Sequence, residues 1–238
     1  MLRRRSNHPG DKELPVPTIL ITGAGRGLGL ALVHRFAELG WETLGTVRDP
    51  AQRDALPRGS RAFTCDVTQR DDLARLAREL EGRAVDVLFC NAGLFGTRQQ
   101  TVGHVDYALW AEVMRVNVFA PMACVEALVD HVAASARRQI VMMSSRLGSI
   151  TENSGGEVVY RSSKAALNAV TRSLAADLAP RGITLAAVHP GWVQTDMGGP
   201  RAPLTPAESA RDVSKVVLEL TPEKSGRFFN YDGTEIPW

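Results

Sequence analysis

The 238-residue sequence is poor in features that mark several protein classes. It has three cysteines, Cys65, Cys90 and Cys124, at wide spacings and with no Cys-x-x-Cys pair. An odd count spread in this way predicts neither a disulfide framework nor a zinc site. Cys65 and Cys90 lie in apolar runs, where cysteine usually behaves as a small hydrophobic residue. The cysteine usage therefore indicates a reducing, cytoplasmic compartment.

Long hydrophobic runs are also absent. No uninterrupted apolar run approaches the length that spans a bilayer. The opening stretch, MLRRRSNHPGDKELPVP, has a basic cluster with no hydrophobic segment after it, so it is not a secretory signal. The cluster either binds something acidic or belongs to a solvated extension, and we expect residues 1–16 to be disordered. The net charge of +2 gives no indication of a nucleic-acid or membrane partner.

Motifs for metal-dependent and nucleophilic hydrolysis are missing. The five histidines are scattered, no pair has the helical spacing of metal ligands, and no His-Glu-x-x-His occurs. No Gly-x-Ser-x-Gly elbow follows a strand. We therefore expect no catalytic metal and no serine hydrolase.

What the sequence does contain is a regular alternation of short apolar runs and longer amphipathic ones. The strands are rich in Ile, Leu and Val on both faces, which is typical of a parallel sheet covered on both sides. The chain is 44% hydrophobic, enough for a sizeable core. We predict a single doubly wound α/β Rossmann domain over 17–238, with a central parallel sheet of about seven strands and helices on both faces. The predicted strands are 17–22, 41–47, 60–66, 84–90, 138–145, 183–189 and 227–231, and the predicted helices are 27–40, 68–80, 106–133, 157–179 and 205–220.

Capping signals mark two helix starts. Thr68 and Asp71 have capping-box spacing, as do Thr205 and Glu208, with Pro206 at the first helical position. Gly40 is placed to end the first helix.

A glycine-rich turn, ITGAGRGLGLALV, follows the first strand and opens the first helix. Glycine allows positive φ and a close approach of the backbone to a ligand, and the helix N-terminus favours a pyrophosphate. A P-loop would need Gly-Lys-Ser/Thr where this loop has Gly29-Leu30. A methyltransferase-type Rossmann domain has a glycine loop too, but it does not require the later residues described below. The position between strand and helix predicts a dinucleotide site.

The end of the second strand, GTVRDP, bears on which dinucleotide binds. An NAD site usually has an acid here that holds the ribose hydroxyls. Arg48 comes first instead, and Arg26 lies in the glycine loop, so two guanidiniums can hold a 2′-phosphate. Asp49 follows and can also reach a ribose. We expect NADP(H) in preference to NAD(H).

After residue 16 the sequence resembles the short-chain dehydrogenase/reductase family along nearly all its length. TGAGRGLG (22–29) is similar to the family's glycine motif, NAG (91–93) follows the fourth strand, and HPGWVQT (189–195) follows the sixth. The tetrad pattern of the family is filled by Asn117, Ser145, Tyr160 and Lys164. TVRDP, SSRLGSI and the ending FFNYDGTEIPW are most similar to its C-factor and Sniffer-type carbonyl reductase subgroup. The interval from Ser145 to Tyr160 is longer than the commonest family spacing, which leaves the substrate open.

The resemblance implies hydride transfer between NADPH and a carbonyl, with Tyr160 as general acid or base. Lys164, four residues on, lies on the same helical face. At about 4 Å a cation contributes about 4 kcal/mol, enough to bring the tyrosine pKa from about 10 toward 7, although desolvation opposes it. Ser145 would stabilise the developing charge on the carbonyl oxygen, with Ser144 as the competing assignment. Asn117 would sit in a local helix bulge and connect Lys164 to solvent through a water.

The resemblance also implies a set of residues that hold the cofactor. Asp66 would contact the adenine amino group, the NAG segment would pass the adenosine ribose, and Thr195 would bond the nicotinamide half. The full set is Gly23, Gly25, Arg26, Gly27, Leu28, Gly29, Arg48, Asp66, Val67, Asn91, Ala92, Gly93, Tyr160, Lys164, Pro190, Gly191, Val193 and Thr195.

Around the tetrad, the loop 192–204 has two glycines and two prolines and is expected to be a mobile lid. Trp192 and Met197 either line an apolar pocket or belong to the core. Arg146 and Arg161 either meet an anionic substrate or form structural ion pairs.

We therefore expect an NADP(H)-dependent enzyme that reduces a small aldehyde or ketone, as a homodimer or homotetramer. Two alternatives remain. One is a dinucleotide-binding signalling module of C-factor type with incidental turnover. The other is a 3-oxoacyl thioester reductase.

Overall fold

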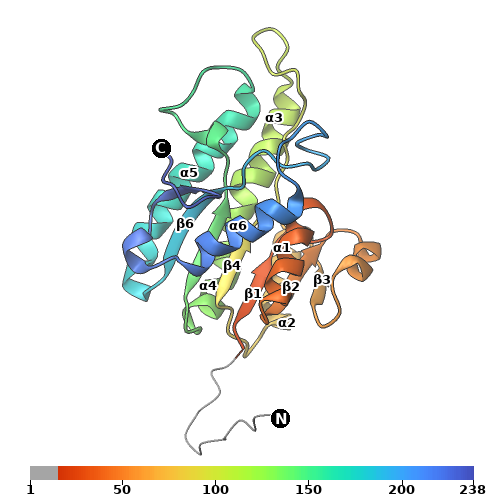
Figure 1. Cartoon of the computed structure of the whole chain (residues 1–238), viewed down its shortest axis with the longest axis vertical. Helices are drawn as coiled ribbons and strands as arrows, with labels where there is room; N and C mark the ends of the chain where they lie inside the picture. Colours follow the sequence, from red (N-terminus) through yellow and green to blue (C-terminus); the bar gives the residue numbers. More distant parts are fainter. Residues whose placement is uncertain (1–15) are drawn as a thin grey trace, which may run out of the picture.

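A seven-stranded sheet forms the centre of the computed structural model, which describes residues 16–238 (Figure 1). The sheet order is β3-β2-β1-β4-β5-β6-β7, and every neighbouring pair is parallel. The chain winds outward from β1 to one edge and then returns to β4 on the other side of β1, so the carboxyl ends of β1 and β4 form a topological switch point. The strands are β1 (Thr18–Ile21), β2 (Glu42–Val47), β3 (Arg61–Thr64), β4 (Val87–Cys90), β5 (Gln139–Met143), β6 (Thr184–His189) and β7 (Phe228–Asn230).

Helices cover both faces of the sheet, as predicted. They are α1 (Gly27–Glu38), α2 (Arg70–Glu79), α3 (Tyr107–Met114), α4 (Ala120–Ala133), α5 (Val158–Leu178) and α6 (Pro206–Leu218). Side chains of α1 and α6 pack on one face of the sheet, and those of α2, α4 and α5 pack on the other. Successive residues of one strand point alternately into the two cores. Ile19 and Ile21 of β1 belong to one core, and Leu20 belongs to the other. Each fully buried Leu, Ile or Phe contributes about 1.5–3 kcal/mol.

The predicted helix over 106–133 is divided in three. Between α3 and α4 lies a π-helical turn, η2 (Arg115–Phe119), which contains Asn117. The predicted bulge at Asn117 is therefore confirmed. The stretch Tyr107–Ala133 corrects the expectation on hydrophobic length. It has 27 residues, and an 18-residue window within it has a mean hydropathy of 1.3, so it is long and apolar enough to cross a membrane by length and composition alone. Charged residues interrupt the stretch, so a search for uninterrupted runs overlooks it, and its apolar side packs into the core.

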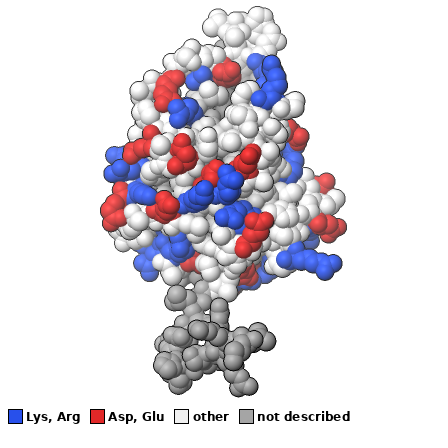
Figure 2. Space-filling view, in the orientation of Figure 1, with Lys and Arg blue, Asp and Glu red and all other residues white. Residues whose placement is uncertain are grey.

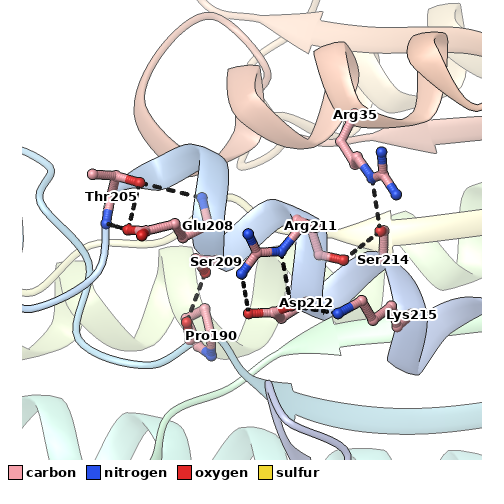
Figure 3. Close-up of polar contacts among 9 residues, drawn as sticks. All are labelled: Arg35, Pro190, Thr205, Glu208, Ser209, Arg211, Asp212, Ser214 and Lys215. Carbon is pink, nitrogen blue, oxygen red and sulfur yellow. Dashed lines mark hydrogen bonds and ion pairs between the residues drawn. The ribbon is translucent and has the colours of Figure 1, made fainter.

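Of the two predicted capping boxes, one is confirmed. The Thr205 hydroxyl accepts from the Glu208 N–H, and the Glu208 carboxylate accepts from the Thr205 N–H at 2.9 Å (Figure 3). The Thr68 box is wrong, because α2 begins at Arg70 and Thr68 donates instead to the carboxylate of Asp66 at 2.8 Å. The Asp66 carboxylate also accepts the Thr68 N–H at 2.9 Å, forming a local turn that competes with the cap.

The described residues carry mixed charge on the face shown in Figure 2, where Lys and Arg alternate with Asp and Glu over the middle of the molecule. Single-sign patches of the kind that attract nucleic acid are not evident on this face. The expectation of disorder for 1–16 falls almost wholly on residues 1–15, which lie outside the described residues, and Val16 is exposed.

Candidate functional site

The glycine loop occupies the switch point, and its glycines are required by positive φ or by close contacts. Gly23 and Gly27 have φ of +67° and +54°. A Cβ on Gly29 would lie 2.2 Å from the Gly23 carbonyl oxygen and 2.6 Å from the Asn91 Nδ2, so α1 and the loop after β4 approach too closely for any side chain. A Cβ on Gly25 would meet the side chain of Gln52 at 2.4 Å. We call the surface formed by the backbone of Gly23, Gly25, Gly27 and Gly29 the cradle; glycine lets a ligand approach this backbone closely.

The first turn of α1 faces this cradle without a protein cap. Arg26 is the N-cap residue and makes no capping hydrogen bond, and the first turn, which includes Leu28, carries no acidic residue. The N–H groups of such a turn are suited to bind an anionic group. The cradle and the uncapped helix start together fit the pyrophosphate of a dinucleotide.

The loops that follow β1 and β4 are locked together at Thr22. Its hydroxyl accepts from the N–H groups of Asn91 and Ala92 at 3.0 and 3.1 Å, and its carbonyl accepts from the Asn91 side chain at 2.9 Å. The backbone of Ala92 lies 3.1 Å from the position of a Cβ on Gly23. The predicted Asn91-Ala92-Gly93 segment thus borders the glycine loop. Thr22 belongs to the glycine motif, but the sequence alone did not show that it connects the loop after β1 to the loop after β4.

At the end of β2, Arg48 and Asp49 differ in how they are engaged. Arg48 is exposed and pairs with no carboxylate among the described residues. The Asp49 carboxylate accepts from the Ala51 N–H at 2.9 Å and caps the 3₁₀ helix η1 (Pro50–Ala55). Asp66, at the end of β3, is held by Thr68, and Val67 beside it is buried. Arg48 is thus open to contact from a ligand, whereas the Asp49 carboxylate is engaged locally.

The four predicted tetrad residues converge at the carboxyl ends of β4 and β5. Tyr160 and Lys164 project from α5, and both are buried, with exposed fractions of 7% and 3%. The Lys164 ammonium lies 5.7 Å from the Tyr160 ring centroid and donates to the Met143 carbonyl at 2.8 Å. A Cβ on Gly93 would lie 3.4 Å from the Asn117 Oδ1 and 3.7 Å from the Lys164 Nζ. The tetrad therefore lies beside the segment that follows β4.

Asn117 is fully buried in the π-helical turn and forms hydrogen bonds with the segment that follows β4. Its Oδ1 accepts from the Leu94 N–H at 2.7 Å, and its Nδ2 donates to the Leu94 carbonyl at 2.8 Å and to the Ser163 hydroxyl at 3.0 Å. The extra residue of the π turn aims the amide at this segment.

The structure separates the two candidate serines. Ser144 is buried, and its hydroxyl donates to the Asn168 Oδ1 at 2.6 Å. The Ser145 hydroxyl accepts from the Leu147 N–H at 3.2 Å and caps η3 (Arg146–Gly148). It also lies near enough to the Tyr160 hydroxyl to lower the pKa of that group. Ser145 is the serine that meets the tyrosine.

Burial sets the protonation of the tyrosine and the lysine. It raises the pKa of Tyr160 to about 12, against a smaller lowering effect of Ser145. It lowers the pKa of Lys164 to about 8. The expectation that Lys164 brings the Tyr160 pKa toward 7 is not met, because desolvation dominates and the ammonium is directed at the Met143 carbonyl.

The Pro190-Gly191 segment after β6 is fixed by α6. The Ser209 hydroxyl donates to the Pro190 carbonyl at 2.7 Å (Figure 3). Gly191 has φ +83°, and a Cβ there would lie 2.4 Å from Leu204. Val193 is buried and bridges to Leu204, which closes the loop on itself.

The predicted lid, 192–204, is folded over the glycine loop. Asp196 forms an ion pair with Arg26, and the Thr195 methyl lies 3.4 Å from the position of a Cβ on Gly27. Trp192 donates to the Gly198 carbonyl at 2.8 Å. Trp192 is 53% and Met197 38% exposed, so neither belongs to the core.

The two arginines near the tetrad are engaged structurally. Arg146 pairs with Glu152 at 3.2 Å, and Arg161 is buried with its Nε 3.5 Å from the Glu157 carboxylate. Among residues 16–238, no group of three His, Cys, Asp or Glu side chains is placed to hold a metal ion.

Comparisons with known proteins agree with this arrangement. The family model for short chain dehydrogenases matches residues 17–203. The chain is 46% identical to the C-signal of Myxococcus xanthus over 155 residues, 65% of this chain and 93% of that protein. The carbonyl reductase Sniffer of D. melanogaster superposes with a TM-score of 0.88 at 34% identity, over 94% of this chain and 100% of that one. A short-chain dehydrogenase/reductase of Burkholderia multivorans with bound NADP superposes with a TM-score of 0.84 at 38% identity, over the same shares.

Proposed function

Because this chain belongs to the short-chain dehydrogenase family, we propose that it is an NADP(H)-dependent oxidoreductase that reduces a small aldehyde or ketone. The observation that carries the proposal is the position of the buried Tyr160 hydroxyl beside Ser145. Both lie at the carboxyl end of the parallel sheet, where the glycine loop also lies. A dinucleotide bound in the cradle supplies the hydride.

The chain's own residues supply the proton and the charge stabilisation. Tyr160, with a pKa of about 12, is protonated at neutral pH and can donate its proton to the oxygen of a carbonyl as that oxygen gains negative charge. Ser145 can donate a hydrogen bond to the same oxygen. Lys164 places a cation near the resulting phenolate and stabilises it, and Asn117 holds the neighbouring segment in register.

The preference for NADP(H) is supported by the contrast between Arg48 and Asp49. Arg48 is exposed and has no carboxylate partner among the described residues, whereas the Asp49 carboxylate is engaged as a cap. The Burkholderia multivorans relative carries NADP in its structure. A guanidinium that bonds a phosphate contributes about 1.5–3 kcal/mol, or roughly 10- to 150-fold in affinity.

The experiment that tests the cofactor is a calorimetric titration with NADPH and with NADH in the same buffer. We expect stronger binding of NADPH, and a loss of that preference in Arg48→Gln with NADH binding unchanged. Equal binding of both cofactors by the natural chain would overturn the assignment of Arg48 and direct attention to Asp49.

The experiment that tests the chemistry is Tyr160→Phe, assayed with NADPH and a panel of aldehydes and ketones. Turnover should fall by at least about 100-fold while NADPH binding persists, because the substitution removes only the proton donor. Retained turnover would contradict the proposed role. Activity confined to acyl thioesters would favour a 3-oxoacyl thioester reductase instead.

A second candidate function rests on the similarity to the C-signal of Myxococcus xanthus. In that case the chain would be a dinucleotide-binding signalling module. Tyr160→Phe separates the two, since a signalling module keeps its biological effect when turnover is lost.

We also propose a homo-oligomer in the cytoplasm. Tyr107 and Phe119, on the α3–η2 stretch, are 76% and 61% exposed and are available for contact with a second subunit. The hollow beside Tyr107, of about 320 Å³, is lined by Trp110, Met114 and Ser162 but by no tetrad residue. Light scattering that gives a monomer mass would contradict the oligomer.

The cytoplasmic location is supported by the three free, buried thiols, which suit a reducing compartment.

A further inference from the structure

Gln100 is a buried polar side chain outside every helix and strand. It lies in the segment between β4 and α3, at the top of Figure 1, where neighbouring residues are exposed, yet it is only 2% exposed itself. Its amide oxygen accepts from the Tyr160 N–H at 2.9 Å, and its amide nitrogen donates to the Phe95 carbonyl at 3.2 Å and to the Thr97 carbonyl. Both ends of the amide are satisfied, as a buried amide requires.

The first of these bonds is made at the start of α5. The first N–H groups of a helix have no partner within it. Glu157, the N-cap residue of α5, has φ +39° and offers no side-chain cap. Gln100 therefore acts as a cap supplied from 60 residues earlier in the chain, and it caps the turn that carries Tyr160.

The same segment is connected to Tyr160 in two further ways, one direct and one through Ser163 and Asn117. The Phe95 ring packs on the Tyr160 ring with centroids 4.7 Å apart. The Tyr160 carbonyl accepts from the Ser163 hydroxyl at 2.7 Å, and that hydroxyl accepts from Asn117, which also holds Leu94. The backbone N–H, the carbonyl and the ring of Tyr160 are all connected to the segment 94–100.

We propose that Gln100 is a positioning residue for Tyr160, and that its amide fixes the first turn of α5 against the segment 94–100 so that the tyrosine hydroxyl stays beside Ser145. This inference rests on the proposed function, in which Tyr160 is the general acid. Gln100 itself touches neither Ser145 nor Lys164 among its hydrogen bonds, so it acts through the tyrosine backbone.

The chain offers a matched control one residue away. Gln99 is exposed, and its only hydrogen bond among the described residues comes from its backbone N–H to the Thr97 hydroxyl at 3.3 Å. Gln99→Leu therefore makes the same chemical change as Gln100→Leu without removing a bond to Tyr160. Gln100→Glu keeps the acceptor for the Tyr160 N–H and loses the donor to Phe95 and Thr97.

Steady-state kinetics of carbonyl reduction provide the first test. We expect Gln100→Leu to lower kcat by about 10- to 100-fold, because a buried N–H and two buried carbonyls lose their partner. KM for the carbonyl and the Kd for NADPH should change by no more than about three-fold, since neither binding surface includes Gln100. Gln100→Glu should also lower kcat, because it sets a carboxylate against the Phe95 and Thr97 carbonyls, and Gln99→Leu should match the natural chain. An unchanged kcat in Gln100→Leu would overturn the proposal.

Titration of the tyrosine provides a readout that does not depend on turnover. Absorbance of tyrosinate after pH jumps, with Tyr160→Phe as the reference, assigns the ionisation of Tyr160. Gln100→Leu should lower the Tyr160 pKa from about 12 toward its ordinary value, because a loosened segment admits water. If the natural chain reduces no carbonyl, the proposed function fails, and this titration still decides whether Gln100 positions Tyr160. An unchanged Tyr160 pKa in both Gln100 variants would overturn the inference. An equal fall of the Tyr160 pKa in Gln99→Leu would overturn it as well.

Discussion

Arg26 of the glycine loop forms an ion pair with Asp196 of the loop after β6. The pair joins the two loops that flank the dinucleotide cradle, and both side chains are well exposed. Arg26 is also one of the two guanidiniums that we expect to meet a 2′-phosphate, and in that case Asp196 would compete with the phosphate for it.

Release of Arg26 should therefore tighten NADPH binding. Asp196→Asn is expected to increase affinity for NADPH by up to about five-fold, because an exposed ion pair is worth about 0–1 kcal/mol. Affinity for NADH should stay the same, since NADH has no 2′-phosphate. Calorimetric titration of both cofactors measures the change, and weaker NADPH binding in the variant would show that the ion pair supports the site.

The rate of carbonyl reduction should fall as pH rises through about 8. Tyr160 keeps its proton until about pH 12, but Lys164 loses its charge near pH 8, and the cation that stabilises the phenolate is lost with it. Initial rates at saturating NADPH between about pH 6 and 10 test this. Lys164→Arg keeps its charge over the whole range, so any activity that it retains should show no fall near pH 8. A flat profile for the natural chain would contradict the role of Lys164.

The cap of α6 should contribute measurably to stability. Thr205→Ala removes the hydroxyl that accepts the Glu208 N–H and should lower the free energy of unfolding by about 1 kcal/mol. Thr205→Ser keeps the hydroxyl and serves as the control. Urea unfolding at neutral pH provides the measurement, and equal losses in the two variants would mean that the methyl group, not the cap, stabilises the helix.

His189, at the end of β6, should make the fold sensitive to acid. Burial lowers its pKa from 6.5 to about 4, with Arg146 acting in the same direction and Asp232 opposing. The unfolded chain therefore binds this proton more readily, so stability is fully present above about pH 6.5 and is lost as pH falls toward 4. The loss should be on the order of 1–3 kcal/mol, at the low end because the ring is partly exposed.

Replacement of the histidine isolates this contribution. His189→Gln has no group that titrates in this range, so its stability should fall less between about pH 7 and 4.5 than that of the natural chain. Urea unfolding at both values measures the difference. An identical fall in both proteins would assign the acid sensitivity to other groups.

Sequence patterns predicted the features that depend on neighbours along the chain. The alternation of apolar runs predicted the parallel sheet and its two helical layers, and the glycine spacing predicted the cradle. Thr68 shows where a local pattern fails, since Asp66, two residues earlier, takes the hydroxyl that the capping box required.

Features that depend on the fold were not visible in the sequence. Gln100 follows an identical residue, and only the packing of the segment after β4 on α5 shows which of the two glutamines is buried. Ser209 similarly holds Pro190 only because α6 crosses the end of β6. The direction of the Lys164 ammonium follows from the position of the Met143 carbonyl, which no spacing rule gives.

The burial of all three thiols provides an internal reporter of unfolding. Cys65, Cys90 and Cys124 are each no more than 2% exposed, and burial raises the pKa of Cys65 to about 12. A thiol reagent therefore reaches almost none of the three thiols in the native state and reacts when the core opens. Because Cys90 precedes Asn91 directly, modification rates measured with and without NADPH give the opening frequency of the core beneath the cradle, with no label or engineered residue.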